Sequence, residues 1–347
     1  MKALNLCSGI DISKNDFHAC LISLEEDWKL KVVKSRKFSN TVQGISDYIY
    51  WISLESKKRD LEVSHIMEAT GVYYEHLALS LSASSEKVTV VLPNKSKRYI
   101  ESLGIKTKND KSDAKALAMM GIQQKLDLWS PLSNYFYELR ALTRMYQSHQ
   151  ENIISLKNQQ EALKHGMYEQ VELITQSDEL IKMFKEYSKK LHDKIAHHIE
   201  SNEEVSIKAS NICKIKGIST LTFAIIIAET NGFELFTKSS QLVSFAGYDV
   251  VENQSGMHRG RTKISKKGNS RIRRALHLPS FTAVKYDNRF KDFYQRVVES
   301  SHVKMKGYVA VQKKLLVIIY SLWKNNQPYI ENYLKPEIKI SVLDNNI

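Results

Sequence analysis

Four carboxylates in the first third of the chain follow apolar stretches in an order that suits phosphoryl-transfer chemistry. Asp11 comes at the end of the apolar run in "SGIDIS", and Glu68 ends the run in "SHIME". Asp110 and Asp113 are three residues apart at the start of a helical stretch, so they share one of its faces. Ionised carboxylates that converge would repel one another. A divalent ion relieves this repulsion, and oxygen ligands suit Mg²⁺ or Mn²⁺, two of which can hold both oxygens of an in-line displacement.

Each of these acids also has a simpler interpretation. Asp11 fits a turn at a strand end, and Glu68 fits an exposed charge. Asp110 or Asp113 fits a cap or first-turn acid that the helix dipole favours. Their joint order on the expected elements favours one shared metal site over four separate roles. Three other acids fit that geometry less well: Asp16, Glu75 and Asp127.

A serine in a strongly basic stretch is the second candidate for chemistry. Ser255 precedes Gly256, and His258–Arg274 contains eight Lys and Arg but no carboxylate. A serine hydroxyl needs a base or an electrostatic sink to act as a nucleophile, and the glycine lets another backbone approach closely. Ser255 could therefore attack a phosphodiester, or it could be a polar loop residue that only touches phosphate. The basic residues expected to bind nucleic acid here are Arg259, Arg261, Lys263, Lys266, Lys267, Arg271, Arg273 and Arg274.

The stretch "KIKGIS" between two apolar helical segments resembles a helix-hairpin-helix. In that motif, backbone N–H groups bind a phosphate without reading sequence. The commoner pattern is Pro-Gly-Ile-Gly, and here Lys216 and Ser219 replace the proline and the second glycine around Gly217. We expect these three residues to contact nucleic acid, and the alternative is a plain packing corner between two helices.

The positive charge of the chain lies in its last third. Residues 206–347 contain 23 Lys or Arg and 10 Asp or Glu, which accounts for the whole net charge of +13. A basic field of this size is typical of a nucleic-acid partner, because Lys and Arg displace counterions from phosphates. The interleaved Gly and Ser argue against a membrane-binding amphipathic helix.

The elements that must position the acids alternate between strand-like and helix-like stretches. Three β-rich stretches within 4–39 precede a helix at about 42–54. The order continues with a strand at 64–70, a helix at 75–83, a strand at 87–93 and helices near 95–102 and 110–124. This order fits a ribonuclease-H-like α/β domain, with a hairpin-led mixed sheet and helices on its faces.

The rest of the chain reads as helical. Positions at steps of three and four predict a heptad seam, which we interpret as an antiparallel hairpin or a dimerising coiled coil. After residue 206 we expect a helical region, a basic loop with the serine, and two or three further helices. The expected boundaries are 1–130, 131–205, 206–330 and a tail at 331–347. The seam positions are Leu139, Leu142, Tyr146, His149, Ile153, Leu156, Gln160, Leu163 and Met167.

Composition excludes several other classes of protein. The three cysteines are far apart and form neither a disulfide framework nor a zinc site, which suits a reducing cytoplasm. No apolar run approaches the roughly 20 residues of a membrane span, and the first residues lack the pattern of a signal peptide. We therefore expect a cytoplasmic protein with no membrane partner.

Six stretches together resemble one family of mobile-element enzymes. They are "GIDISKNDF", "MEATGVYYEHLALSL", "KTKNDKSDAKALA", "KIKGIS", "SQLVSFAGYDVVENQSG" and "KISKKGNSRIRRAL". In order and spacing, over about 1–330, the chain resembles the DEDD-type insertion-sequence transposases related to the Piv DNA invertase, recombinases guided by a bridge RNA. The family's serine motif more often reads Ser-Ser-Gly-Gly, and here the neighbours of Ser255 differ.

The resemblance implies a RuvC-like first domain, a coiled-coil middle and a C-terminal transposase domain. It also implies that Asp11, Glu68, Asp110 and Asp113 bind the metal and that Ser255 joins covalently to DNA. Expected partners are donor and target DNA, a bridge RNA, and further copies of the chain in a dimer or tetramer. The alternatives are a ribonuclease-H-type nuclease that uses water, and a non-catalytic nucleic-acid-binding protein.

Overall fold

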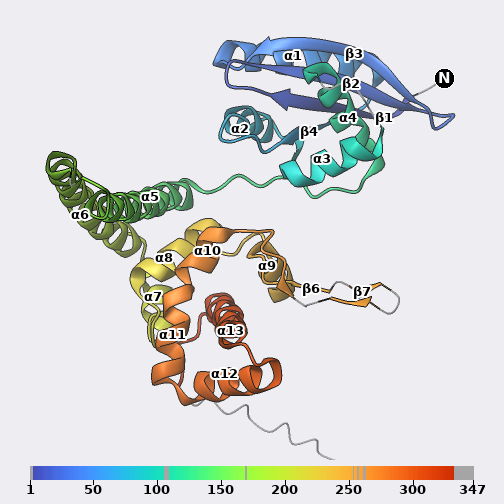
Figure 1. Cartoon of the computed structure of the whole chain (residues 1–347). Coiled ribbons are helices and arrows are strands. Elements are labelled where there is room, and N and C mark those ends of the chain that lie inside the picture. The colour runs from blue at the N-terminus through green and yellow to red at the C-terminus, as the bar shows by residue number, and fades with distance from the viewer. Residues whose placement is uncertain are drawn as a thin grey trace, which may run out of the picture. The chain divides into compact units, whose positions relative to one another are not determined.

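A five-stranded mixed sheet forms the centre of the first of two units, Met1–Pro131 and Leu132–Ile347. The computed structural model describes residues 3–104, 109–168, 170–252, 254–255, 258–260 and 263–331 (Figure 1). Arg261 and all but the first residue of the expected tail lie outside these ranges, and of Arg259 only the backbone is described.

The order of strands in the first unit is β3-β2-β1-β4-β5. The first three strands in sequence form an antiparallel meander, and β4 and β5 are added in parallel to β1. This hairpin-led mixed sheet is the arrangement expected for a ribonuclease-H-like domain. The strands are β1 (Ala3–Ile12), β2 (Asp16–Glu25), β3 (Leu30–Ser39), β4 (Val63–Glu68) and β5 (Lys87–Val91).

Helices cover both faces of this sheet because successive strand residues point to opposite sides. Leu6 and Ile10 of β1 pack in one apolar cluster with residues of α1 and α2. Cys7, between them in sequence, packs on the other face against Leu117 and Met120 of α4. The helices are α1 (Val42–Arg59), α2 (Glu75–Ala83), α3 (Pro93–Ser102) and α4 (Asp110–Gln123). The predicted order of strands and helices in the first unit is thus confirmed.

Two long antiparallel helices begin the second unit, α5 (Asn134–Lys164) and α6 (Val171–Glu200). Polar residues fix their register: Gln160 donates to Asp178 at 2.8 Å, and Gln150 donates to Ser188 at 3.0 Å. The seam predicted from sequence ends sooner than expected. Helix α5 ends at Lys164, so Met167 lies in the turn and is 89% exposed.

The base of this helix pair belongs to the same core as the C-terminal helices. Leu139 and Ile195 are buried in one cluster with α8, α11 and α13. The boundary expected at 205 falls within the first turn of α7 and not between two helices, and a division of tasks at this point stays a proposal. The C-terminal helices are α7 (Glu203–Ile212), α8 (Thr220–Glu229), α9 (Ser239–Phe245), α10 (Ser270–Ala275), α11 (His277–Tyr286), α12 (Asn288–Ser301) and α13 (Lys304–Asn325).

The basic segment between α9 and α10 forms short strands where a loop was expected. Strand β6 (Val250–Val251) pairs with β9 (Lys263–Ile264), and β7 (Gln254–Ser255) pairs with β8 (His258–Arg259), both antiparallel. Figure 1 shows this two-stranded projection leaving the helices beside α9. We call residues 250–264 the serine arm. Within the described part of the chain four helices follow it, where two or three were expected.

Candidate active site

The backbone of the first unit brings the four predicted carboxylates to one end of the sheet, where β1 and β4 finish. We call this end of the strands the acidic edge. Asp11 is the next-to-last residue of β1, and Glu68 is the last residue of β4. These strands are parallel neighbours, with Ile10 opposite Met67, so both acids emerge at the same end. The two strands therefore supply one acid each to a common edge.

Helix α4 brings the other two acids to this edge by packing directly on β1. A Cβ atom at Gly9 would lie 2.1 Å from the carbonyl oxygen of Ala114 and 2.2 Å from the backbone nitrogen of Ala118. Only glycine allows this approach, since both neighbours are backbone atoms of α4. One turn before Ala114, the first turn of α4 contains Asp110 and Asp113, which are predicted metal ligands.

The start of α4 is fixed by a capping box that was not predicted from the sequence. The side chain of Asn109 accepts a hydrogen bond from the backbone N–H of Ser112 at 2.8 Å, and Ser112 accepts one from the N–H of Asn109 at 3.0 Å. Both acids thus have a defined backbone position. Their place in the first turn also suits the helix dipole, which was the simpler interpretation of them.

Two unpredicted side chains contact these acids. His18 lies opposite Asp11 in the β1–β2 ladder, and its Nδ1 is 3.6 Å from Oδ2 of Asp110. The hydroxyl of Ser96, fully buried at the start of α3, donates a 2.6 Å hydrogen bond to Oε2 of Glu68. A serine in a short polar helix carries no sequence signal of this role. His18 has one weak signal, since it follows the Asp11 turn on the paired strand.

The side chains of the four acids are not gathered around one point. Within the described ranges, no three His, Cys, Asp or Glu side chains are close enough to hold one metal ion together. Asp110 instead faces His18, and Glu68 accepts the Ser96 hydrogen bond. The donor set still suits Mg²⁺ or Mn²⁺, because all four groups are hard oxygen ligands on neighbouring backbone positions.

Ser255 lies far along the serine arm, directly opposite His258 in the ladder. Its side chain is exposed, and it makes no hydrogen bond to any other side chain or backbone group that the structure describes. The backbone thus places the Ser255 hydroxyl at the surface, where a nucleophilic serine would need a base or an electrostatic sink beside it.

The arm leaves the second unit through a tightly packed root. Gly247 has a φ of +75°, and a Cβ atom at Gly268 would lie 2.6 Å from the Gly247 nitrogen. Backbone hydrogen bonds join Ser265 to Asp249 at 2.7 Å and Asn269 to Phe245 at 2.7 Å. The two ends of the arm therefore join the helical unit side by side, at a closely packed and hydrogen-bonded site.

A buried carboxylate holds this root to the centre of the unit. Glu229, at the end of α8 and 7% exposed, accepts bonds of 2.7 and 2.9 Å from Arg144 of α5. It also accepts a 2.7 Å bond from the Asn269 amide. Burial opposes ionisation of this carboxyl, but Arg144, Asn269 and the nearby charge of Arg271 outweigh it and hold its pKa below the usual value. The sequence did not indicate that Glu229 anchors the root of the arm, because an acid at the end of an apolar helix is usually a surface residue.

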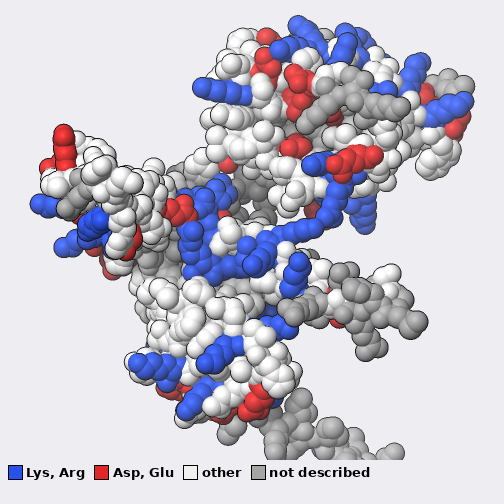
Figure 2. Space-filling model, viewed as in Figure 1, with Lys and Arg blue, Asp and Glu red and all other residues white. Residues whose placement is uncertain are grey.

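The predicted basic residues fall into two groups. The three arginines of α10 have partners inside the unit: Arg271 reaches Gln147, Arg273 donates to the carbonyl of Ala246 at 2.8 Å, and Arg274 pairs with Glu151. The lysines make no such contacts with described residues and are exposed, and much of the surface over α10 is blue in Figure 2. The exposed lysines of the arm and its root are Lys263, Lys266 and Lys267.

The glycine turn before α8 has a structural reason of its own. Gly217 has a φ of +94°, and a Cβ atom there would lie 2.9 Å from the carbonyl oxygen of Pro279 in α11. Ser219 caps α8 by accepting from the N–H of Thr222 at 3.2 Å, and Lys216 is exposed. This close helix packing favours the packing-corner interpretation, and phosphate binding by the turn stays a prediction.

Among the described helices none combines the length and apolar character of a membrane span.

Comparison with known proteins also divides the chain into a first part with the four acids and a later part with the serine arm. Residues 8–168 match a family model described as a transposase of the DEDD type, and residues 209–295 match one described as "Transposase IS116/IS110/IS902 family". The first model covers the acidic edge and α5, and the second covers the glycine turn, the serine arm and its root. Both groups of candidate residues are therefore inside regions that define a transposase family.

Similar proteins of known role include the pilin gene-inverting proteins of Moraxella lacunata and Moraxella bovis. Each is 30% identical over 326 residues, which is 92% of this chain and 96% of the relative. Solved structures that match include RuvC of Thermus thermophilus, 12% identical, with a TM-score of 0.26 over 33% of this chain and 91% of that one. A Ppx/GppA phosphatase of Aquifex aeolicus matches 94% of both chains at 9% identity and a TM-score of 0.23. At these TM-scores the structural likeness adds nothing to the assignment. The family models and the two relatives show that the chain belongs to the IS116/IS110/IS902 family of transposases, and it is a DNA transposase and recombinase.

Proposed function

We propose that this transposase cuts DNA by direct attack of the Ser255 hydroxyl on a phosphodiester. The Ser255 oxygen forms a bond to phosphorus, the bond from phosphorus to one sugar oxygen breaks, and that oxygen leaves with the proton of the hydroxyl. The products are a phosphoserine ester and a strand end with a free hydroxyl. Attack of another strand's hydroxyl on this ester rejoins DNA and regenerates the serine.

The observation that carries this proposal is that one site has the nucleophile and the other has the metal-binding groups. The serine arm presents an exposed hydroxyl in a basic segment, and the described residues of the arm form no cluster of carboxylates that could hold a metal ion. The edge of the first unit presents four carboxylates without a nucleophile, on backbone that β1, β4 and α4 hold in place. Each site supplies what the other lacks, so we infer that they act together on one phosphate.

Asp11, Glu68, Asp110 and Asp113 are the residues that would hold divalent metal, Mg²⁺ or Mn²⁺. When bound, such ions stabilise the negative charge that develops on the attacking and leaving oxygens. Ser96 would keep the Glu68 carboxylate turned to one side through its 2.6 Å hydrogen bond. The lysines of the arm and its root, Lys263, Lys266 and Lys267, would hold the phosphates that flank the cut.

Recombination breaks and rejoins four strands, so we propose that a dimer or tetramer assembles around the DNA. The resemblance to bridge-RNA-guided recombinases also makes a structured RNA the proposed guide to the target. Sequencing RNA that copurifies with the protein tests this part. One defined RNA from the flank of the element supports it, and a random sample of cellular RNA contradicts it.

Three variants separate this mechanism from hydrolysis by water. With a DNA duplex that contains the element's end, we expect Ser255→Ala and Asp11→Ala each to abolish cleavage, and Ser265→Ala at the root of the arm to retain it. Retained cleavage by Ser255→Ala, with loss in Asp11→Ala, would identify a ribonuclease-H-type nuclease instead. Binding with a steep salt dependence and no cleavage by the unaltered protein would identify a non-catalytic binding protein.

A further inference from the structure

A groove between α5 and α6 has a charge that the proposed chemistry does not use. Its floor is closed by the buried side chains of Ile153 and Ser188, the second of which accepts the Gln150 hydrogen bond. Its volume of about 370 Å³ is many times the ~30 Å³ that a water molecule occupies in the liquid. A phosphate group therefore fits within it.

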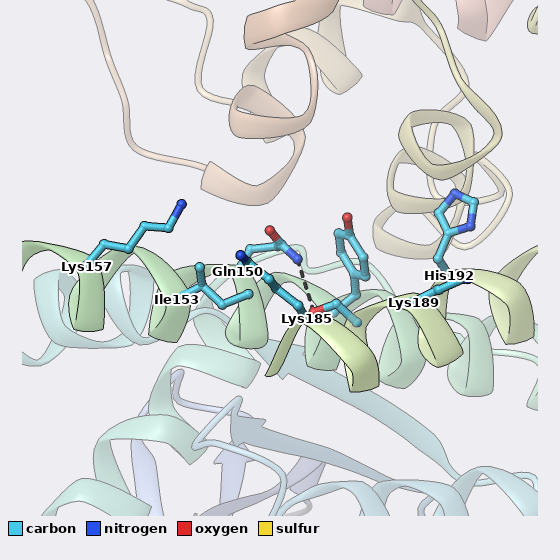
Figure 3. Close-up of a pocket in the computed structure, with 8 residues that line it drawn as sticks. Gln150, Ile153, Lys157, Lys185, Lys189 and His192 are labelled. Atoms are coloured by element: carbon cyan, nitrogen blue, oxygen red, sulfur yellow. Dashed lines mark hydrogen bonds between the residues drawn. The ribbon is translucent and has the colours of Figure 1, made fainter. Parts of the chain in front are cut away.

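The basic side chains of this groove come from both helices. Lys157 of α5 stands on one wall, and Lys185, Lys189 and His192 stand on α6. Figure 3 shows Lys157 and His192 rising to the same side of the helix pair, toward opposite ends of the groove. None of the described residues that line the groove is Asp or Glu. The helix pair as a whole is not basic, since 134–200 contains nine Lys or Arg and ten Asp or Glu. The groove therefore has a local positive charge that the helix pair as a whole lacks.

The three lysines have no anionic partner within the described ranges. None of them forms an ion pair there, although other charged residues of the same helices do, such as Glu161 with His165. His192 lies 3.7 Å from Asp193, its neighbour on α6. Like charges that gather on a surface without a counter-charge cost free energy, which an external anion removes.

The spacing of these groups indicates a polymer rather than a small anion. Lys185, Lys189 and His192 recur at steps of four and three, so they form a row about 10 Å long on one face of α6. A site for one small anion would instead converge its donors on a point. A row of basic side chains with a facing lysine matches a chain of regularly spaced phosphates.

We propose that this groove binds the phosphodiester backbone of a nucleic-acid strand. The site is separate from every basic residue predicted from the sequence. The proposal depends on the chain's membership in a transposase family and not on the role of Ser255. DNA and RNA share the backbone chemistry that the groove recognises, so the experiment must include both.

The test compares two double variants of α6 that remove equal charge. Lys185→Gln with Lys189→Gln removes the row, and Lys190→Gln with Lys194→Gln removes exposed lysines that do not line the groove. Binding of the full chain to a random-sequence DNA duplex and to an RNA hairpin is followed by fluorescence anisotropy over a range of salt concentrations. No divalent metal is present, so binding is measured without cleavage.

We expect the groove variant to bind about tenfold more weakly and to lower the salt slope by about two, because two phosphate contacts are lost. The control variant should change affinity by less than about twofold. Loss with DNA alone identifies a DNA strand as the occupant, loss with RNA alone identifies an RNA strand, and both support the site. Equal losses in the two variants, or none in the groove variant, would overturn it.

Discussion

Asn269 donates a 2.7 Å hydrogen bond to Oε2 of Glu229, forty residues earlier in the chain. This bond joins the exit of the serine arm to the end of α8, a helix buried along most of its length. Arg144 of α5 binds the same carboxylate through two further hydrogen bonds. The position of the arm is therefore set by a charge network inside the second unit, although the arm itself is exposed.

Glu229→Gln should destabilise the second unit by about 1–3 kcal/mol, because it removes the charge that Arg144 and Arg271 face, although both arginines are partly exposed to water. Glu186→Gln is the matched control, since Glu186 is exposed on α6 and has no ion pair with a described residue. Chemical denaturation of both variants measures the difference. Equal free energies of unfolding for both variants and the unaltered chain would show that the network contributes nothing.

The same network predicts a pH dependence. The pKa of Glu229 in the folded chain lies below its ordinary value of 4.5, so its ionised form stabilises the fold. This contribution is complete above pH 4.5 and is lost as the pH falls through the lower, folded value. In thermal melts, the Tm of the unaltered chain should exceed that of Glu229→Gln most near neutral pH, and this difference in Tm should disappear in acid. A difference in Tm that grows in acid would show instead that the neutral carboxyl is the stabilising form.

Asn269→Ala should loosen the serine arm specifically. Asn269 also caps α10 by accepting from the N–H groups of Arg271 and Ile272, so loss of the cap costs about 1 kcal/mol. Asn202 caps α7 by accepting from the N–H of Val205 and is not part of the arm or its root, which makes Asn202→Ala the control. We expect a larger loss of stability for Asn269→Ala, which also removes the bond to Glu229, and faster amide hydrogen exchange in β6 and β9 only for this variant. Unchanged exchange in both strands would refute an anchoring role.

Gly9→Ala should separate α4 from β1 and so displace Asp110 and Asp113. The added Cβ atom would overlap backbone atoms of Ala114 and Ala118, which cannot move without the helix. Overpacking of this kind costs about 1–3 kcal/mol or more. Gly166→Ala is the control, because the nearest atom to its Cβ is 3.5 Å away. Comparing Tm values tests this, and a Gly9→Ala chain as stable as the control would disprove the close approach.

Ser96→Ala should weaken binding of divalent metal by about 10–100-fold, because it releases the Glu68 carboxylate from its hydrogen bond. Ser102→Ala on the same helix removes an exposed hydroxyl that bonds to the carbonyl of Tyr99, away from the acids, and it should leave affinity unchanged. Calorimetric titration of Mn²⁺ into the DNA-free protein provides a readout that is independent of cleavage. Equal affinities for the two variants would remove Ser96 from the site.

The first unit could be predicted well from the sequence because its signals are local. β-rich stretches predicted β1 and β2, and the helix expected near 110–124 matches α4. The edge shared by the acids followed from strand order. Gly9 was not recognised, because its role depends on a helix more than a hundred residues away.

The serine arm and its anchor were harder to predict for the same reason. Two-residue strands carry too little periodicity to be told from a loop, so the segment around Ser255 was expected to be irregular. The pairing of Glu229 with Arg144 spans 85 residues and leaves no trace in local spacing. The α10 arginines were predicted as phosphate ligands from charge alone, whereas each reaches a partner within the unit.

The most direct test of the mechanism is to find the atom that joins protein to DNA. The transposase is incubated with a duplex that carries the element's end and a nick that traps the cut strand, and the denatured adduct is digested and sequenced by mass spectrometry. We predict one nucleotide-bearing peptide, modified at Ser255, and its absence from Ser255→Ala and Asp11→Ala. An adduct at any other residue, or cleaved DNA with no protein attached, would contradict this mechanism.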